Sequence, residues 1–124
     1  MKVIVLILIG LASVGTVVVA LLLASDCEDT IKIEAKSPDG KYLATYYERD
    51  CGATTDFSTI VQLRDSSASF EGDALGSVIV KGQHKLDLVW DDNRKLRLQC
   101  HDCRAEDIFK QEKTWKDIDI SFLH

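Results

Sequence analysis

The chain has 124 residues, a formal charge of −5 and a pI of about 5.1. Without the uncharged segment near its start, about a hundred residues remain, with 14 basic and 20 acidic side chains and thus a charge of −6. This balance argues against nucleic acids and anionic lipid headgroups as partners, because both require a clustered basic face, and the length fits one small domain.

The first element along the chain is a predicted transmembrane anchor over residues 1–25. An α-helix needs about 20 apolar residues to cross the hydrocarbon core, and the 22 residues from Val3 to Ala24 carry no charge. Two alternatives stay open: a cleaved secretory signal and a lipoprotein signal that ends at Cys27. The segment is longer than the roughly 7–15 apolar residues of a signal peptide, and Asp26 stands where a lipoprotein signal has a small residue.

All three alternatives place the rest of the chain outside the cytoplasm. Lys2 precedes the uncharged segment and acidic residues, Asp26 first among them, follow it, as the positive-inside rule requires. We therefore expect a single-pass protein of the inner (cytoplasmic) membrane that contacts the bilayer through residues 3–24. Residues 26–124 are the expected extracytoplasmic β domain.

Alternation of apolar and polar residues predicts the first two strands. Ile31, Ile33 and Ala35 alternate with charged residues, which is the pattern of a strand with one buried face. The following Ser37-Pro38-Asp39-Gly40 predicts a turn, because proline presets φ and glycine accepts a positive φ. Residues 41–49 should then return as the antiparallel partner.

The same pattern predicts five further strands, over residues 59–64, 78–80, 86–90, 96–100 and 118–122. A polar loop is expected over 65–73, and a short helix over 104–113 with Ile108 and Phe109 on its apolar side. Seven strands, tight turns and one short helix predict a mostly β fold, either a small antiparallel β-sheet or a sandwich.

Two hairpins share a local pattern. The segment from Ser37 to Thr45 resembles the strand-turn-strand consensus of β-propeller repeats, and a weaker copy runs from Leu86 to Leu96. A propeller needs about four or more blades. We therefore interpret both segments as hairpins of one small sheet.

A wider resemblance covers most of the part after the anchor. It rests on the SPDGKY hairpin, the segment from Glu48 to Thr59 that contains ERDCGATT, residues 85–92, the Cys100-x-x-Cys103 pair and residues 115–120. Together these resemble a family of small, uncharacterised bacterial envelope proteins in which a leader or anchor precedes the hairpin. The resemblance implies an envelope location and one unified domain, and it implies no activity.

Four cysteines follow the uncharged segment: Cys27, Cys51, Cys100 and Cys103. Outside the cytoplasm an oxidising environment favours disulfides. Four cysteines allow three connectivities, and the sequence does not choose among them. We expect Cys51, Cys100 and Cys103 to take part in disulfides, whereas Cys27 has no counterpart in the pattern of the envelope family.

The Cys100-His101-Asp102-Cys103 motif suggests two other chemistries. A thioredoxin-like enzyme would need a βαβ unit and a later proline, but Pro38 is the last proline of the chain. With His101 and Cys51 the motif offers ligands for zinc or copper(I), yet a structural zinc site usually draws on two close ligand pairs. We assign no metal, no cofactor and no catalytic residue, and keep a thiol-disulfide or metal-handling protein as the alternative function.

The polar stretch after the second strand predicts a recognition loop, because loops on a rigid sheet often carry binding residues. Its candidates are Arg49, Asp50, Thr54, Thr55 and Asp56. The alternative is a wide connection whose threonines and aspartates bond to their own backbone. Without a credible catalytic constellation, we favour a non-enzymatic module that binds or scaffolds another envelope or secreted protein, such as an immunity or inhibitor protein.

Overall fold

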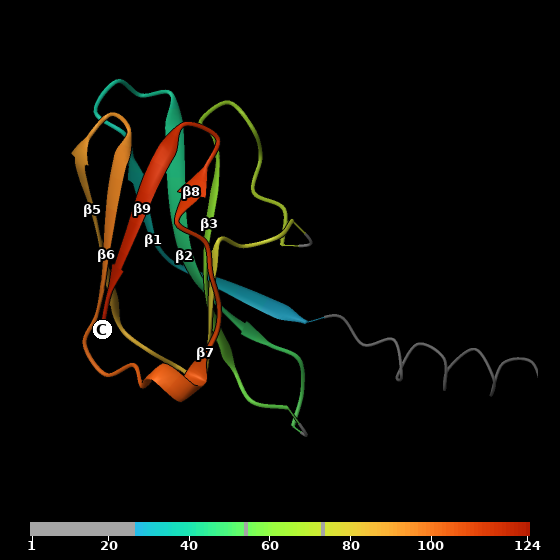
Figure 1. Cartoon of the computed structure of the whole chain (residues 1–124). Coiled ribbons are helices and arrows are strands. Elements are labelled where there is room, and N and C mark those ends of the chain that lie inside the picture. The colour runs from blue at the N-terminus through green and yellow to red at the C-terminus, as the bar shows by residue number, and fades with distance from the viewer. Residues whose placement is uncertain (1–26, 54, 73) are drawn as a thin grey trace, which may run out of the picture.

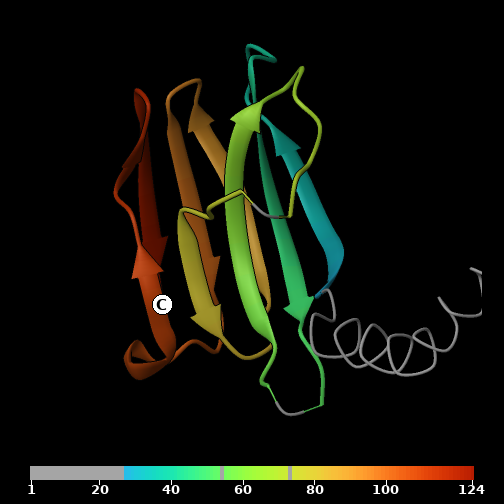
Figure 2. The same cartoon turned by 90° about the vertical axis from the view of Figure 1, so that its right-hand side faces the viewer.

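The computed structural model of the chain describes residues 27–53, 55–72 and 74–124, which form two β-sheets packed face to face (Figure 1, Figure 2). The strands are β1 (Glu28–Lys36), β2 (Tyr42–Asp50), β3 (Ser58–Asp65), β4 (Val78–Lys81), β5 (Leu86–Asp92), β6 (Lys95–Cys100), β7 (Ile108–Gln111), β8 (Thr114–Trp115) and β9 (Ile118–Leu123). A single 3-10 turn, η1 (Ala105–Asp107), is the helical element of the described residues. The mostly β fold class is thereby confirmed.

No helix within these described ranges is long and apolar enough to cross a bilayer. The predicted anchor over residues 1–25 lies outside them, as does the first residue of the predicted domain.

The sheets differ in size and strand direction. One has five strands in the order β1-β2-β3-β4-β7, and the other has four in the order β5-β6-β9-β8. The expectation of one small sheet for both hairpins is wrong, because β1-β2 and β5-β6 lie in different sheets. The pairing is antiparallel except between β6 and β9, which are parallel. Residues 101–117 separate these two strands and supply the crossover that a parallel pair requires.

The core fills the space between the two sheets. Both sheets contribute its buried residues, namely Ala44, Tyr46, Val61, Leu63, Val78, Val80, Leu86, Leu96, Leu98, Cys100, Ile118, Ile120 and Phe122. At one edge of the sandwich the indole N–H of Trp90 donates to the carbonyl of Ala35, with 2.9 Å between nitrogen and oxygen. This bond joins β5 to β1 across the two layers.

All seven predicted strands are present, but the predicted helix over 104–113 is wrong. After η1 the chain extends as β7 and pairs with β4. Ile108 packs against the core, whereas Phe109 is 82% exposed. Helix propensity is a weak preference that tertiary context overrides, and here the edge of β4 offers a ladder of hydrogen bonds.

The predicted turn between β1 and β2 has Gly40 at a φ of 76°. Asp39 organises it: its Oδ1 accepts from the hydroxyl of Ser37 at 2.8 Å and from the N–H of Lys41 at 3.1 Å. Its Oδ2 lies 3.0 Å from a guanidinium nitrogen of Arg94, in the turn between β5 and β6. These bonds, with the Ser37 bond as the largest effect, lower the pKa of Asp39 to about 2.

This lowered pKa predicts an acid-sensitive contribution to stability. The ionised Asp39 stabilises the fold above its unfolded pKa of about 4, and the contribution is lost as the pH falls toward about 2. We expect Asp39→Asn to reduce the free energy of unfolding at neutral pH and to flatten its fall between about pH 4 and pH 2. Urea unfolding followed by circular dichroism at several pH values measures both effects. Ser37→Ala should give an intermediate slope, and equal slopes for the wild type and Asp39→Asn would contradict the prediction.

Candidate functional site

The connection from β3 to β4 lies across the outer face of the five-stranded sheet (Figure 2). We call residues 66–77 the strap. The side-chain amide of Gln62 donates to the strap carbonyls of Glu71 at 2.9 Å and Ala74 at 3.4 Å. Phe70 of the strap meets the ring of Tyr47 edge-on, with 4.9 Å between ring centroids. The strap therefore gives part of this sheet a second buried face.

Glycine allows the strap to approach the sheet closely. A Cβ atom on Gly76 would collide with Cγ2 of Ile60 and would lie 3.1 Å from the carbonyl oxygen of Val61. A Cβ atom on Gly72 would collide with the carboxylate of Asp29. The strap thus ends against β3 at a position that has no room for a side chain.

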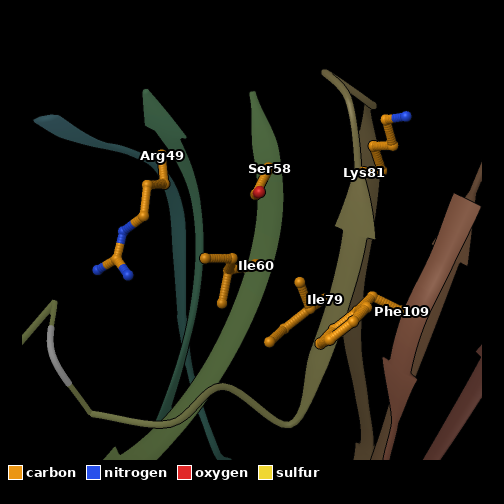
Figure 3. Close-up of a pocket in the computed structure, with 6 residues that line it drawn as sticks. All are labelled: Arg49, Ser58, Ile60, Ile79, Lys81 and Phe109. Atoms are coloured by element: carbon orange, nitrogen blue, oxygen red, sulfur yellow. The ribbon is translucent and has the colours of Figure 1, made fainter. Parts of the chain in front are cut away.

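Beyond the strap, the same outer face forms a groove (Figure 3). Its volume is about 410 Å³, and its lining residues are Arg49, Ser58, Ile60, Ile79, Lys81 and Phe109. Strand register explains the set, because Arg49, Ser58 and Lys81 lie side by side across β2, β3 and β4. Ile60 and Ile79 form the next row. The groove therefore has an apolar floor and a more polar end.

Phe109 reaches the groove through an irregularity in β7. Ile79 pairs with Lys110 while Val80 pairs with Ile108, so Phe109 is an extra residue in the ladder. Such β-bulges re-aim a side chain at a sheet edge. A phenylalanine that is 82% exposed beside an apolar floor offers an aromatic side chain of the kind that protein interfaces use as an anchor.

The cations of the groove are held in different ways. Arg49 forms an ion pair with Asp29 at 2.8 Å and donates to the carbonyl of Gly72 in the strap. Lys81 lies 3.3 Å from Asp56, and both side chains are well exposed. Neither acidic partner lines the groove. The described part of the lining therefore carries two cationic side chains, each paired with a carboxylate outside the groove.

The residues predicted as a recognition loop separate into two groups. Arg49 lines the groove, and Asp56 contacts its Lys81. Asp50 and Thr55 instead bond within the loop: the N–H of Gly52 donates to Asp50, and the hydroxyl of Thr55 donates to the Gly52 carbonyl. Thr54 lies outside the described residues. The sequence pattern did not indicate Ile79, Lys81 or Phe109 as groove residues.

Two disulfides are present, Cys27–Cys51 and Cys100–Cys103. Cys27 directly precedes β1 and Cys51 directly follows β2, so the first bridge closes the open end of that hairpin. The expectation of disulfides is thus confirmed. Cys27, which has no counterpart in the envelope family's pattern, is the partner of Cys51.

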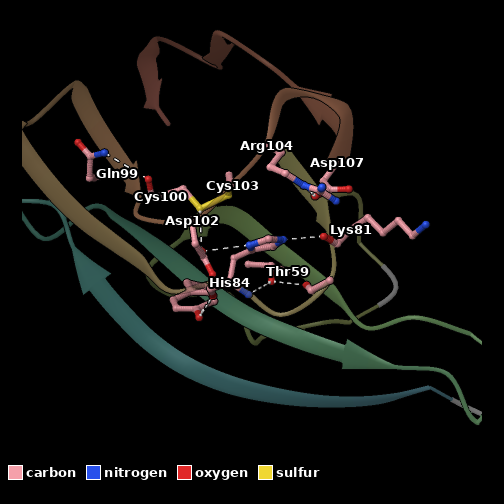
Figure 4. Close-up of polar contacts among 11 residues, drawn as sticks. Thr59, Lys81, His84, Gln99, Cys100, Asp102, Cys103, Arg104 and Asp107 are labelled. Carbon is pink, nitrogen blue, oxygen red and sulfur yellow. Dashed lines mark hydrogen bonds and ion pairs between the residues drawn. A yellow bond between two sulfur atoms is a disulfide. The ribbon is translucent and has the colours of Figure 1, made fainter.

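The second disulfide belongs to a polar corner at one end of the sandwich (Figure 4). We use this name for Cys100, Cys103, His84 and Asp102, which offer ligand atoms within 4.8 Å of one another. Nδ1 of His84 lies 3.1 Å from Oδ1 of Asp102, and the sulfur of Cys100 lies 3.7 Å from the same oxygen. Sulfur, nitrogen and oxygen donors therefore converge in one place.

This corner differs from the metal ligand set considered from the sequence. His101 points to Asp87, with 2.7 Å between Nε2 and Oδ2, and Cys51 is bonded to Cys27. His84 takes the place expected for His101. The sequence carries no signal for His84, because it stands 18 residues from Asp102 and outside the motif.

The main chain and the ring of His84 are both fixed. Its N–H donates to the hydroxyl of Thr59 at 3.0 Å, and its carbonyl accepts from the hydroxyl of Tyr46. Burial raises the pKa of Tyr46, which keeps this hydroxyl a donor. Nε2 of the His84 ring lies 2.7 Å from the carbonyl oxygen of Lys81. The histidine is therefore held in one orientation toward Asp102.

Comparison with protein-family models, with curated proteins and with solved structures gives no match for this chain. The resemblance to bacterial envelope proteins stays a prediction, and the function rests on the groove and the polar corner.

The close approach of the strap predicts a steric penalty at Gly76. We expect Gly76→Ala to reduce the free energy of unfolding by about 1–3 kcal/mol, because the new methyl group displaces Ile60 or the strap. Urea unfolding measures this difference. Ser69→Ala, an exposed position in the same strap, serves as the control and should change it by less than about 0.5 kcal/mol. A Gly76→Ala chain as stable as the wild type would show that the strap does not press on β3.

Proposed function

We propose that the chain is a membrane-anchored protein of the bacterial envelope whose β domain binds another envelope or secreted protein through the groove. The observation that carries this proposal is the exposure of Phe109 beside the apolar floor formed by Ile60 and Ile79. Exposed aromatic residues in such positions anchor many protein interfaces. Phe109 would gain the free energy of apolar burial if a partner covered it, and the half-buried Ile79 would gain a smaller amount.

The chemistry of the groove favours a particular kind of partner segment. A volume of about 410 Å³ is in the range of about 300–1,000 Å³ that holds a small organic group, which corresponds to a few side chains. Lys81 and Arg49 flank the floor, in a domain whose net charge is negative. We propose an apolar segment with neighbouring carboxylates, because charge complementarity would orient it here and disfavour other faces.

The proposed location rests on the ends of the uncharged segment and on the cysteines. Lys2 before Val3 and the acidic residues after Ala24 support an amino terminus in the cytoplasm. The two disulfides of the β domain support an oxidising compartment. A bilayer anchor next to the domain would keep the groove close to the membrane surface, where other envelope proteins are concentrated.

Photo-cross-linking in native membranes tests the groove as the binding surface. A photoreactive phenylalanine derivative at position 109 of the full-length chain should give one discrete adduct with a second protein. The same derivative at Val89, an exposed position on β5 of the other sheet, is the matched control and should not. Mass spectrometry should place the linked peptide of the partner next to Asp or Glu residues.

The identified partner then allows a quantitative test with purified proteins. We expect Phe109→Asp and Lys81→Glu to weaken binding by about tenfold or more, since they remove an aromatic anchor and reverse a rim charge. Val89→Asp should leave the affinity unchanged. An adduct between two copies of this chain, equal adducts at positions 109 and 89, or binding that is insensitive to both groove substitutions would overturn the proposal.

Membrane fractionation tests the anchor and the orientation. The chain should resist carbonate extraction and keep its full mass of 13.8 kDa. Protease added outside cells stripped of their wall should digest the β domain, whereas a cytoplasmic marker protein stays intact. A shorter chain in the soluble envelope fraction would instead identify a cleaved signal, and protection of the domain would contradict its extracytoplasmic location.

A further inference from the structure

In the polar corner the His84 ring lies between two acceptor oxygens, the carbonyl of Lys81 and the carboxylate of Asp102. The carbonyl oxygen of Lys81 can only accept, so the hydrogen of a neutral His84 ring lies on Nε2, which contacts that oxygen at 2.7 Å. Nδ1 then presents a lone pair to Oδ1 of Asp102 at 3.1 Å. Two acceptor atoms 3.1 Å apart repel each other unless a cation binds to both. That cation is either a proton or a metal ion.

The surroundings of His84 are those of a metal-ligating histidine. Such residues usually donate their second ring N–H to a carboxylate or a backbone carbonyl, which fixes the tautomer and the ring orientation. Here the Lys81 carbonyl has this role, while Thr59 and Tyr46 hold the main chain. The side chain is only 10% exposed. The ring is therefore preorganised to present Nδ1 to the corner.

The two sulfur atoms complete a four-ligand set. Tetrahedral zinc with sulfur at about 2.3 Å and nitrogen or oxygen at about 2.0–2.2 Å separates its ligand atoms by about 3.3–3.8 Å. The four ligand atoms of the corner already lie within 4.8 Å of one another. When the disulfide is opened, rotation of the Cys100 and Cys103 side chains can move the two sulfur atoms apart. The course of the main chain stays the same.

We propose that reduction of the Cys100–Cys103 disulfide by a dithiol converts the polar corner into a zinc site with Cys100, Cys103, His84 and Asp102 as ligands. In this step the S–S bond breaks, and two electrons and two protons pass from the dithiol, which becomes a disulfide. Zn²⁺ then displaces the two thiol protons. Mixed sulfur, nitrogen and oxygen donors suit zinc better than copper(I), which favours soft sulfur ligands over oxygen.

The corner is accessible to both reactants. Cys103 is half-buried while Cys100 is fully buried, so a dithiol would attack the sulfur of Cys103 first. Beside His84 and Asp102 lies an open pocket of about 410 Å³ that is also lined by Lys32, Tyr46 and Glu48. The metal would enter from this pocket. The domain would thereby retain zinc under reducing conditions and release it on oxidation.

Zinc titration of the full-length protein in detergent tests the proposal. The oxidised chain and the chain reduced with a phosphine are titrated in competition with a chromophoric chelator, and Co²⁺ serves as a spectroscopic substitute. We expect one zinc ion per reduced chain, none per oxidised chain, and a tetrahedral Co²⁺ spectrum with thiolate charge transfer. His84→Ala and Asp102→Asn should weaken binding by about 10–100-fold. His101→Ala, a neighbouring exposed histidine, should not.

The reductant also opens Cys27–Cys51, so each cysteine pair needs its own variant. Zinc binding should persist when Cys27 and Cys51 are both replaced by serine. It should be lost when Cys100 and Cys103 are both replaced by serine. Circular dichroism monitors folding of each reduced chain. Failure of the folded, reduced wild type to bind zinc would overturn the proposal. Three other results would also overturn it: zinc binding that persists without Cys100 and Cys103, zinc binding that His84→Ala leaves unchanged, and zinc binding that occurs only in an unfolded chain.

Discussion

The central strands β2 and β3 of the five-stranded sheet are buried on both faces, and each face therefore needs a layer of the chain that covers it. Residues 44–47 of β2 and 59–63 of β3 are buried without interruption. The four-stranded sheet covers one face and the strap covers the other. Because the chain must enter the sheet again as β4, the strap ends directly before Val78 and leaves the outer face of β4 and β7 without cover. The groove is therefore a consequence of the order of the strands.

A buried outer face also explains the polar residues under the strap. Gln62 is 2% exposed, and its amide donates to two strap carbonyls. Arg64 donates to the carbonyl of Ala68 and lies over the ring of Phe70. Buried backbone groups need partners, and these side chains supply them where no strand is available. The strap is thus held by side chains in the way that strands are held by their neighbours.

The sequence predicted the features that depend on local pattern. Alternation along the chain located seven strands, and the Ser37 to Gly40 turn located the first hairpin, because both are encoded within a few residues. The assignment of strands to two sheets and the parallel pairing of β6 with β9 depend on contacts between distant segments. Phe109 shows the difference clearly: its neighbours in sequence fit a helix, but its place is decided by the edge of β4.

The cysteine pairing illustrates why a site can stay hidden when the strands are known. Lys36 pairs with Leu43, and a regular hairpin continued from there would place Cys27 opposite Gly52. The bulge near Ile31 shifts the register by one residue and brings Cys27 opposite Cys51. His84 and Asp102 likewise meet because the connection from β4 to β5 passes the end of β6. No regular spacing in the sequence predicts either the Cys27–Cys51 pairing or the contact between His84 and Asp102.

The Cys27–Cys51 bridge has a mechanical consequence. β1 is an edge strand bonded to β2 alone, and the preceding part of the chain is attached to it through Cys27. A pull on that chain would load the end of β1 first and peel its hydrogen bonds from β2 one after another. The bridge carries the load past β1 to the end of β2, which is bonded on both sides. Several strands would thus share a force applied through the amino-terminal segment. The domain would resist unfolding by a force that, without the bridge, would peel β1 from β2.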